Sequence, residues 1–312
     1  MKLINKTHRN FYALLQLIIG FSSFFIFINY FWREMLNELI FVFSSYEKVF
    51  KVTIIFILLK TISYFLKSIH TSKLYSLFSI KIKTQDFFSM SVIQGIMATF
   101  LPLNLSTGLK MIYLKIRYKL KFLNFGKMEL LSFFIFYYGY FCFFITGILG
   151  FYFKHNVFVS LLIFSFIICF FPLIQKLTVG ILKLENFPKF DFKTYFYGIA
   201  NDIAYYSALY FLIVIVLKYD ISFHSILIYT FVIQISMIIN ITPSNIGLRE
   251  WFMALVAPLV GLDHNQGALI SILDRTLSII FLLIFYPYSY KVLFINTKIK
   301  SNKILENFTL DA

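Results

Sequence analysis

Continuous hydrophobic runs of about 20 residues recur along this chain, and they constrain its fold more than any other feature. A helix needs about 20 apolar residues to cross the hydrocarbon core of a bilayer. Sixty per cent of the 312 residues are hydrophobic, whereas a soluble domain has about 45–50% apolar residues. The runs do not alternate as the strands of an outer-membrane barrel do. The sequence therefore predicts an all-α integral membrane protein, with residues 1–312 as a single membrane domain.

A motif occurs twice inside this apolar sequence. Its two copies are Val92-Ile93-Gln94, Pro102-x-Asn104, Gly108-Leu109-Lys110 and Val232-Ile233-Gln234, Pro243-x-Asn245, Gly247-Leu248-Arg249. Corresponding positions lie 139 to 141 residues apart, which indicates a duplicated unit. Paired hydrophobic segments broken by Pro and Gly are typical of a transporter's binding site. The alternative is two unrelated Pro/Gly loops between helices.

Hydropathy and charge together predict a topology. The candidate spans are about 11–31, 50–67, 128–153, 157–175, 195–217 and 266–290, and the interrupted regions are about 86–107 and 225–260. Lys and Arg gather in cytoplasmic loops. Both flanks of the first interrupted region are strongly basic, whereas the loop 261–265 after the second has no Lys or Arg. This pattern predicts about six transmembrane helices, two re-entrant hairpins and cytoplasmic termini.

The two hairpins are expected to enter the membrane from opposite sides. The half-repeats 50–153 and 195–290 then form an inverted repeat, the arrangement on which alternating access rests in many transporters. This expectation depends on the segment 108–125 remaining on one side of the membrane.

The net charge of +15 does not indicate a nucleic-acid-binding protein, because the cations are spread over short loops between apolar segments. The sequence contains no nucleophile elbow, zinc-protease motif, P-loop or dinucleotide fingerprint. It therefore predicts a protein that is not an enzyme, uses no cofactor or metal, and has membrane lipids as its partners. A homo-oligomer is compatible with the sequence.

Each interruption creates a half-helix N-terminus, whose free N–H groups and dipole favour an anion. In the second copy the candidate residues are Ser244, Asn245, Gly247 and Arg249, and in the first they are Asn104, Gly108 and Lys110, with Ser106 and Thr107 beside them. A cation next to a helix N-terminus opposes the dipole, so its presence suggests a shared phosphate or carboxylate ligand. The alternative is that both cations reach the interface or pair with local acids.

Ionisable residues inside a membrane are costly and are therefore functional candidates. Here they are Asp202, Glu250, Asp274 and Arg275, with Glu129 near the start of a span. Pairs such as Asp202–Arg249 or Glu250–Arg275 would neutralise these charges. A pair that opens to accept a substrate phosphate would combine the structural and functional roles.

These residues also resemble a known family. The run Asn240–Glu250, Gly261 and the later Leu273-Asp274-Arg275 are similar to the C-terminal signature of the lysylphosphatidylglycerol synthase transmembrane-region family, and Leu101-Pro102…Gly108 resembles its earlier motif. Ser244-Asn245 stands where the family has Gly-Gly, and the aminoacyl-transferase domain is missing. The resemblance implies a flippase-type domain of the bacterial inner (plasma) membrane.

Three functional hypotheses follow from the sequence. The first is a flippase that moves a phospholipid or a lipid-linked intermediate between leaflets, with the phosphate held by Arg249 and Lys110. The second is a non-catalytic subunit that scaffolds enzymes of lipid or glycan synthesis. The third is an embedded enzyme that modifies a lipid headgroup, with Glu250, Asp274 or Asp202 as its general base.

Overall fold

The computed structural model describes residues 46–100, 105–153, 157–169, 192–238 and 247–295, with the single residues 18, 22, 40 and 180. These residues are helical, apart from short connections, and form no strand. The predicted all-α class is therefore confirmed over the described part of the chain.

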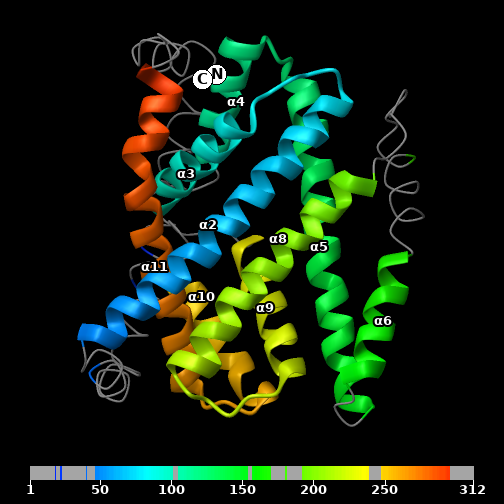
Figure 1. The fold of residues 1–312 in the computed structure, drawn as a ribbon, viewed down its shortest axis with the longest axis vertical. Helices are drawn as coiled ribbons and strands as arrows, with labels where there is room; N and C mark the ends of the chain where they lie inside the picture. Colours follow the sequence, from blue (N-terminus) through cyan, green and yellow to red (C-terminus); the bar gives the residue numbers. More distant parts are fainter. Residues whose placement is uncertain are drawn as a thin grey trace.

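Four long helices run along the vertical axis of the molecule or obliquely to it (Figure 1). They are α2 (Tyr46–Leu77), α5 (Phe122–Tyr152), α8 (Phe192–Tyr210), continued by η1 (Phe211–Val216), and α11 (His264–Tyr290), continued by η4 (Lys291–Ile295). Their stretches 50–77, 122–150, 194–216 and 264–295 are long and apolar enough to cross a membrane. They coincide with the predicted spans at 50–67, 128–153, 195–217 and 266–290. Apart from the single residues 18 and 22, the predicted span 11–31 lies outside the described residues, as does the end of 157–175, whose first part is α6 (Val157–Cys169).

Two of the long helices lie at the centre and two at the flanks, and the two members of each set are antiparallel. Helices α2 and α8 cross the centre side by side and run in opposite directions (Figure 1). Helices α5 and α11 stand on opposite flanks and also run in opposite directions. Each flanking helix packs against a short helix from the other half of the chain, since α5 contacts α9 (Phe223–Ile238) and α11 contacts α3 (Thr84–Phe100).

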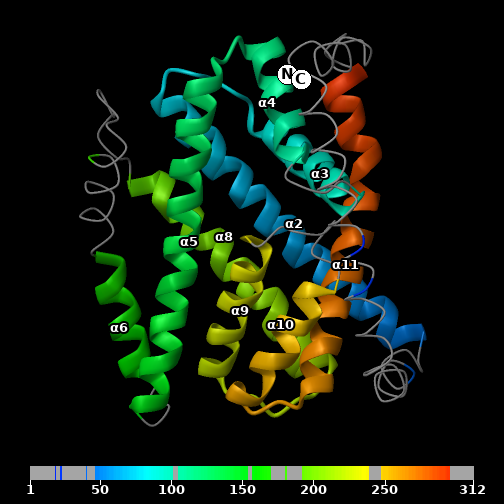
Figure 2. The ribbon, with the colours of Figure 1, turned by 180° about the vertical axis from the view of Figure 1, so that it is seen from behind.

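Two pairs of short helices fill opposite halves of the molecule. Helices α3 and α4 (Leu105–Tyr118) lie in the upper half of the view, and α9 and α10 (Leu248–Val256) lie in the lower half (Figure 1), as the view from behind also shows (Figure 2). Helix α10 continues into η3 (Ala257–Val260). The connections 101–104 and 239–246, which carry both prolines of the repeated motif, lie outside the described residues.

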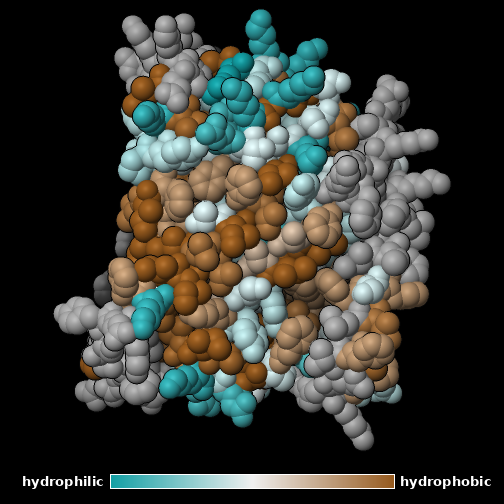
Figure 3. All heavy atoms as spheres, in the orientation of Figure 1, coloured by the Kyte–Doolittle hydropathy of each residue, from teal (hydrophilic) through white to brown (hydrophobic). Residues whose placement is uncertain are grey.

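Side chains are sorted by hydropathy along the vertical axis of the molecule. On the face in view, hydrophobic residues form a broad band across the middle, and hydrophilic residues gather at the upper and lower ends (Figure 3). This banding is what a bilayer imposes on the outer surface of a protein that crosses it. Together with the four long apolar helices, it indicates a membrane protein.

Helix α2 is longer than its predicted span, which ended at residue 67. Lys67 and Lys73, which were assigned to a cytoplasmic loop, lie inside α2. The prediction was wrong because a hydropathy window ends where lysines appear. The helix continues because these lysines have surroundings that tolerate a charge: Lys73 lies over the ring of Tyr197, 5.7 Å from its centroid, and Lys67 faces internal cavities.

Candidate functional site

One buried carboxylate connects three helices at the centre of the molecule. Asp274 of α11 accepts Arg249 of α10 at 2.5 Å and Lys60 of α2 at 3.1 Å. All three side chains are nearly inaccessible, with side-chain exposures of 2%, 4% and 5%. Lys60 also lies over the Tyr205 ring, with its ammonium nitrogen 4.2 Å from the centroid. Two cations thus share one acid, which leaves this cluster with a net positive charge.

Glu250 forms a second buried pair beside the first. Its Oε1 lies 3.0 Å from Arg275, so the predicted Glu250–Arg275 pair is confirmed. Its Oε2 accepts the backbone N–H of Gly247 at 2.9 Å. Gly247 has a φ of 83°, in the left-handed region that favours glycine, and immediately precedes α10.

The capping contact changes the expected anion site. We expected the free N–H groups at the start of α10 to face a ligand, but Glu250 already accepts the N–H of Gly247. One of the N–H groups at this helix start is therefore occupied, and the cationic side chains of Lys60, Arg249 and Arg275 line the cavity beside it. Ser244 and Asn245, which were predicted to join the site, lie outside the described residues.

The first motif copy contains a corresponding ion pair. Lys110 of α4 contacts Glu129 of α5 at 2.7 Å, and the Tyr75 hydroxyl donates to the same carboxylate at 2.9 Å. Gln94 of α3 donates to the Thr107 hydroxyl at 3.2 Å and thereby connects α3 to α4. Gly108 lies next to Thr107 in α4, whereas Asn104 lies outside the described residues.

Asp202 does not pair with Arg249, so that suggested pair is wrong. Its Oδ1 accepts the Asn201 side-chain amide at 3.0 Å, and Asn201 in turn accepts the Ser63 hydroxyl at 2.7 Å. Asp202 also lies against α5, because a Cβ at Gly139 would come within 2.0 Å of its Oδ2. The helical rotation of α8 directs Asp202 towards α5 and leaves Asn201 facing α2.

A cavity of about 280 Å³ lies in front of the Asp274 cluster, and we call it the Arg249 cavity. Among the described residues, its lining includes the four cations Lys60, Lys67, Arg249 and Arg275 and no carboxylate. The acids that neutralise these cations, Asp274 and Glu250, lie behind them. The cavity therefore presents an electropositive wall.

A second cavity, of about 460 Å³, adjoins the first, and we call it the Lys110 cavity. The two cavities share the lining residues Lys67, Tyr140, Asn201 and Gln234. Gln94 and Gln234, the corresponding glutamines of the two motif copies, both line the Lys110 cavity. A space that holds one water needs only about 10–15 Å³ on this measure, so neither cavity is a packing defect.

Lys67 is the cation that both cavities share. It is exposed although it lies well inside α2, because its side chain faces into this internal space. Its ammonium nitrogen lies 5.5 Å from the centroid of the Phe136 ring. No carboxylate of the described residues lies within 4.0 Å of it, in contrast to Lys60, Lys110, Arg249 and Arg275.

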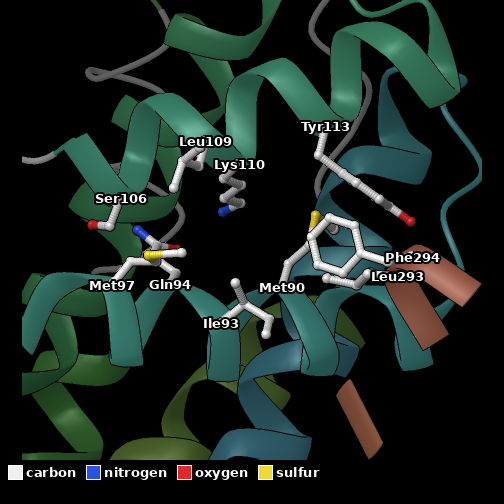
Figure 4. A pocket seen from close by; sticks show the side chains of 10 residues that line it. All are labelled: Met90, Ile93, Gln94, Met97, Ser106, Leu109, Lys110, Tyr113, Leu293 and Phe294. Atoms are coloured by element: carbon white, nitrogen blue, oxygen red, sulfur yellow. The ribbon is translucent and has the colours of Figure 1, made fainter. Parts of the chain in front are cut away.

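An apolar pocket of about 220 Å³ lies on the other side of Lys110, and we call it the Met90 pocket. Its walls come mainly from α3 and α4, with Leu293 and Phe294 of η4 at one end (Figure 4). Gln94 and Lys110 line both this pocket and the Lys110 cavity. An apolar space and a polar, cationic space therefore meet at these two side chains.

Hydrogen bonds and an ion pair connect the start of α3 to the end of α4 beyond this pocket. Asp86 accepts the Tyr118 hydroxyl and lies 3.3 Å from Arg117. Arg117 also donates to the hydroxyl of Tyr113. Burial raises the pKa of Tyr113 to about 12, although Arg117 opposes the shift, so this phenol remains protonated and neutral.

The site thus brings together six of the eleven predicted residues in two linked regions, with Asp202 and Gly108 at their edges, and the remaining three lie outside the described residues. Sequence reasoning missed Lys60, Lys67, Asn201 and the two glutamines. Lys60 could have been found, because a lysine within an apolar span is itself an intramembrane charge. Gln94 and Gln234 were visible as matching motif positions, but nothing in the sequence indicated which way they point.

Among the residues that the structure describes, no group of three His, Cys, Asp or Glu side chains could hold a metal ion.

Comparison of the chain with family models, with curated proteins and with solved structures finds no match. The resemblance to the lysylphosphatidylglycerol synthase transmembrane-region family therefore remains a prediction.

Proposed function

We propose that this protein is a membrane lipid flippase, which moves a lipid with an anionic headgroup from one leaflet to the other. The observation that carries the proposal is the junction at Lys110, where an apolar pocket meets a cationic cavity. A soluble anion would need only the cationic cavity. A lipid needs both, because its acyl chain requires an apolar wall while its phosphate requires cations and hydrogen-bond donors.

In this mechanism the phosphate first meets Lys110 and Lys67 in the Lys110 cavity, where Glu129 keeps its contacts with Lys110 and Tyr75, while an acyl chain occupies the Met90 pocket. Lys67 then carries the phosphate onward, since it borders both cavities. In the Arg249 cavity the phosphate meets Arg249 and Lys60, which share only one carboxylate at rest. Lys67 has no carboxylate within 4.0 Å among the described residues, and Arg249 and Lys60 share one, so the phosphate supplies negative charge that these cations lack.

Alternating access is supported by the arrangement of the short helices. The α3–α4 and α9–α10 pairs lie in opposite halves of the molecule (Figures 1 and 2). The helices that precede the two pairs, α2 and α8, run in opposite directions, and so do the helices that follow them, α5 and α11. With 14 residues, α4 is about 21 Å long and too short to cross the hydrocarbon core. Two re-entrant hairpins in an inverted repeat account for these features.

The family resemblance supports the same function and extends it to the bacterial plasma membrane, and the distribution of Lys and Arg favours termini in the cytoplasm. The described residues include no nucleotide-binding motif, so the driving force in this proposal is a gradient or the lipid's own concentration difference.

The test is lipid scrambling in proteoliposomes with wild type, Lys67→Gln and Lys121→Gln. Lys67 has no carboxylate partner among the described residues, so its neutralisation should leave folding intact and reduce scrambling about tenfold or more, as expected when a charged hydrogen bond to the substrate is lost. Lys121 is exposed outside both cavities and is the matched control.

Equal scrambling activity of the two variants would show that Lys67 does not bind the transported lipid. A wild type without activity towards any lipid would overturn the flippase and favour the scaffold hypothesis.

A further inference from the structure

The two cavities also carry information about the headgroup. Resting on the proposed flippase function, we infer that the substrate headgroup is anionic and rich in hydroxyl groups, such as a phosphate that bears a polyol or a sugar, and that cationic aminoacylated headgroups are excluded. The inference rests on the charges, the amide groups and the size of the space that receives the headgroup.

The charges of the walls exclude a cationic headgroup. The described lining of the Arg249 cavity has four cations and no carboxylate. In the Lys110 cavity Glu129 is the one carboxylate of the described lining, and it is already engaged by Lys110 and Tyr75. A headgroup with a free amine would place its charge among fixed cations without an available acid, which is costly away from bulk water.

Aromatic rings on α5 offer a cationic headgroup little compensation. Phe133, Phe136 and Tyr137 line the Lys110 cavity, and ring faces do attract cations. However, the Lys67 ammonium group already lies 5.5 Å from the Phe136 centroid, and Phe133 and Tyr137 pack against each other at 4.2 Å. A second cation at this wall would be repelled by the first.

Neutral polar groups in the same walls fit hydroxyl groups. Gln94, Asn201 and Gln234 line the space, and each side-chain amide offers both donors and an acceptor. A hydroxyl group also donates and accepts, so an amide can bind it in either role. Thr107 and Ser132 add further hydroxyls to the Lys110 cavity.

The space is larger than a phosphate needs. The adjoining cavities measure about 280 and 460 Å³, comparable with sites of about 300–1,000 Å³ that enclose whole small molecules. A bare phosphate monoester would leave most of the polar wall facing water. A polyol or sugar next to the phosphate would fill the cavity and satisfy the amides.

The experiment is lipid retention by the purified protein, measured by native mass spectrometry after exposure to equimolar pairs of lipids with identical acyl chains. The lipids are phosphatidylinositol, phosphatidylglycerol, phosphatidate, phosphatidylcholine and lysyl-phosphatidylglycerol. We expect phosphatidylinositol and phosphatidylglycerol to be retained about tenfold or more over the cationic lipid, and severalfold over phosphatidate. Equal or preferential retention of lysyl-phosphatidylglycerol or phosphatidylcholine would overturn the inference.

The variant Gln94→Leu tests the role of the amides, with Gln85→Leu as its control. Gln85 is a solvent-facing glutamine on the same helix, bonded to Tyr288. Gln94→Leu should erase the preference for phosphatidylinositol over phosphatidate, whereas Gln85→Leu should keep it. Thr107→Val serves the same purpose if Gln94→Leu does not fold. An unchanged preference in the folded variant would contradict the proposed recognition of hydroxyl groups.

This measurement separates the inference from the proposed function. Retention tests headgroup recognition in detergent, where there are no leaflets, and scrambling tests transport. Selective retention without scrambling would leave the headgroup assignment standing and overturn the flippase. Scrambling at equal rates for all headgroups would leave the flippase standing and overturn the headgroup assignment.

Discussion

Arg249 and Asp274 form a 2.5 Å ion pair that joins the second short-helix pair to the last long helix. Because Lys60 reaches the same carboxylate from α2, this single acid connects α10 and α11 to a helix that is distant in sequence. In the proposed mechanism a phosphate would compete with Asp274 for Arg249 and Lys60. Arg249 and Lys60 would then pair with Asp274 at rest and bind the phosphate during transport.

The first prediction concerns the removal of this acid. Asp274→Asn keeps the shape of the side chain but leaves Lys60 and Arg249 buried without their shared partner. Loss of one member of a buried charge pair costs about 3–5 kcal/mol, so the thermal unfolding temperature in detergent should fall clearly. Asp220→Asn, which removes an exposed acid from the loop before α9, is the matched control. Similar melting of both variants would contradict the structural role of Asp274.

The second prediction concerns the close packing of α10 on α11. A Cβ at Gly267 would lie 2.5 Å from the backbone oxygen of Met253 and 2.7 Å from the Tyr229 hydroxyl, which itself donates to that oxygen. Small residues allow membrane helices to approach in this way. Gly267→Ala should therefore lower the melting temperature and the yield of monodisperse protein. Gly126→Ala in α5 meets nothing within 4 Å and should be neutral or slightly stabilising.

Sequence alone predicted the helical class and four spans, because these follow from hydropathy, which each segment carries by itself. It also predicted the Glu250–Arg275 pair, since two opposite charges in neighbouring apolar segments must find partners. The partner of Arg249 could not be predicted. Asp202 and Asp274 are equivalent as buried acids in the sequence, and the rotation of α8 against α5 decides between them.

The cavities could not be predicted either. In the sequence, Lys67 marks the end of a predicted span. Only the packing of α2 among α3, α5 and α8 shows that its side chain faces the two cavities. The capping of Gly247 by Glu250 was likewise missed, although a Glu three residues after a helix cap is a known signature.

The third prediction separates the two roles of Glu250. Glu250→Gln keeps an oxygen that can accept the Gly247 N–H but removes the charge that pairs with Arg275. Glu250→Ala removes both. The alanine variant should therefore be less stable than the glutamine variant by about 1 kcal/mol, the usual contribution of a helix cap. Equal stabilities, measured by denaturant titration, would show that the capping contact contributes nothing.

The fourth prediction tests the inverted arrangement on which alternating access depends. Lys81 lies in the connection that leads into α3, and Asp220 lies in the connection that leads into α9, at opposite ends of the molecule, and both side chains are exposed. In a background with Cys142→Ala and Cys169→Ala, the variants Lys81→Cys and Asp220→Cys each present one accessible thiol. A membrane-impermeant maleimide applied to intact cells should label Asp220→Cys, and it should label Lys81→Cys only after the membrane is opened. Labelling of both thiols from the same side would place the two hairpins on one face of the membrane. The cations of the two motif copies could then not act in turn on a lipid that passes between leaflets.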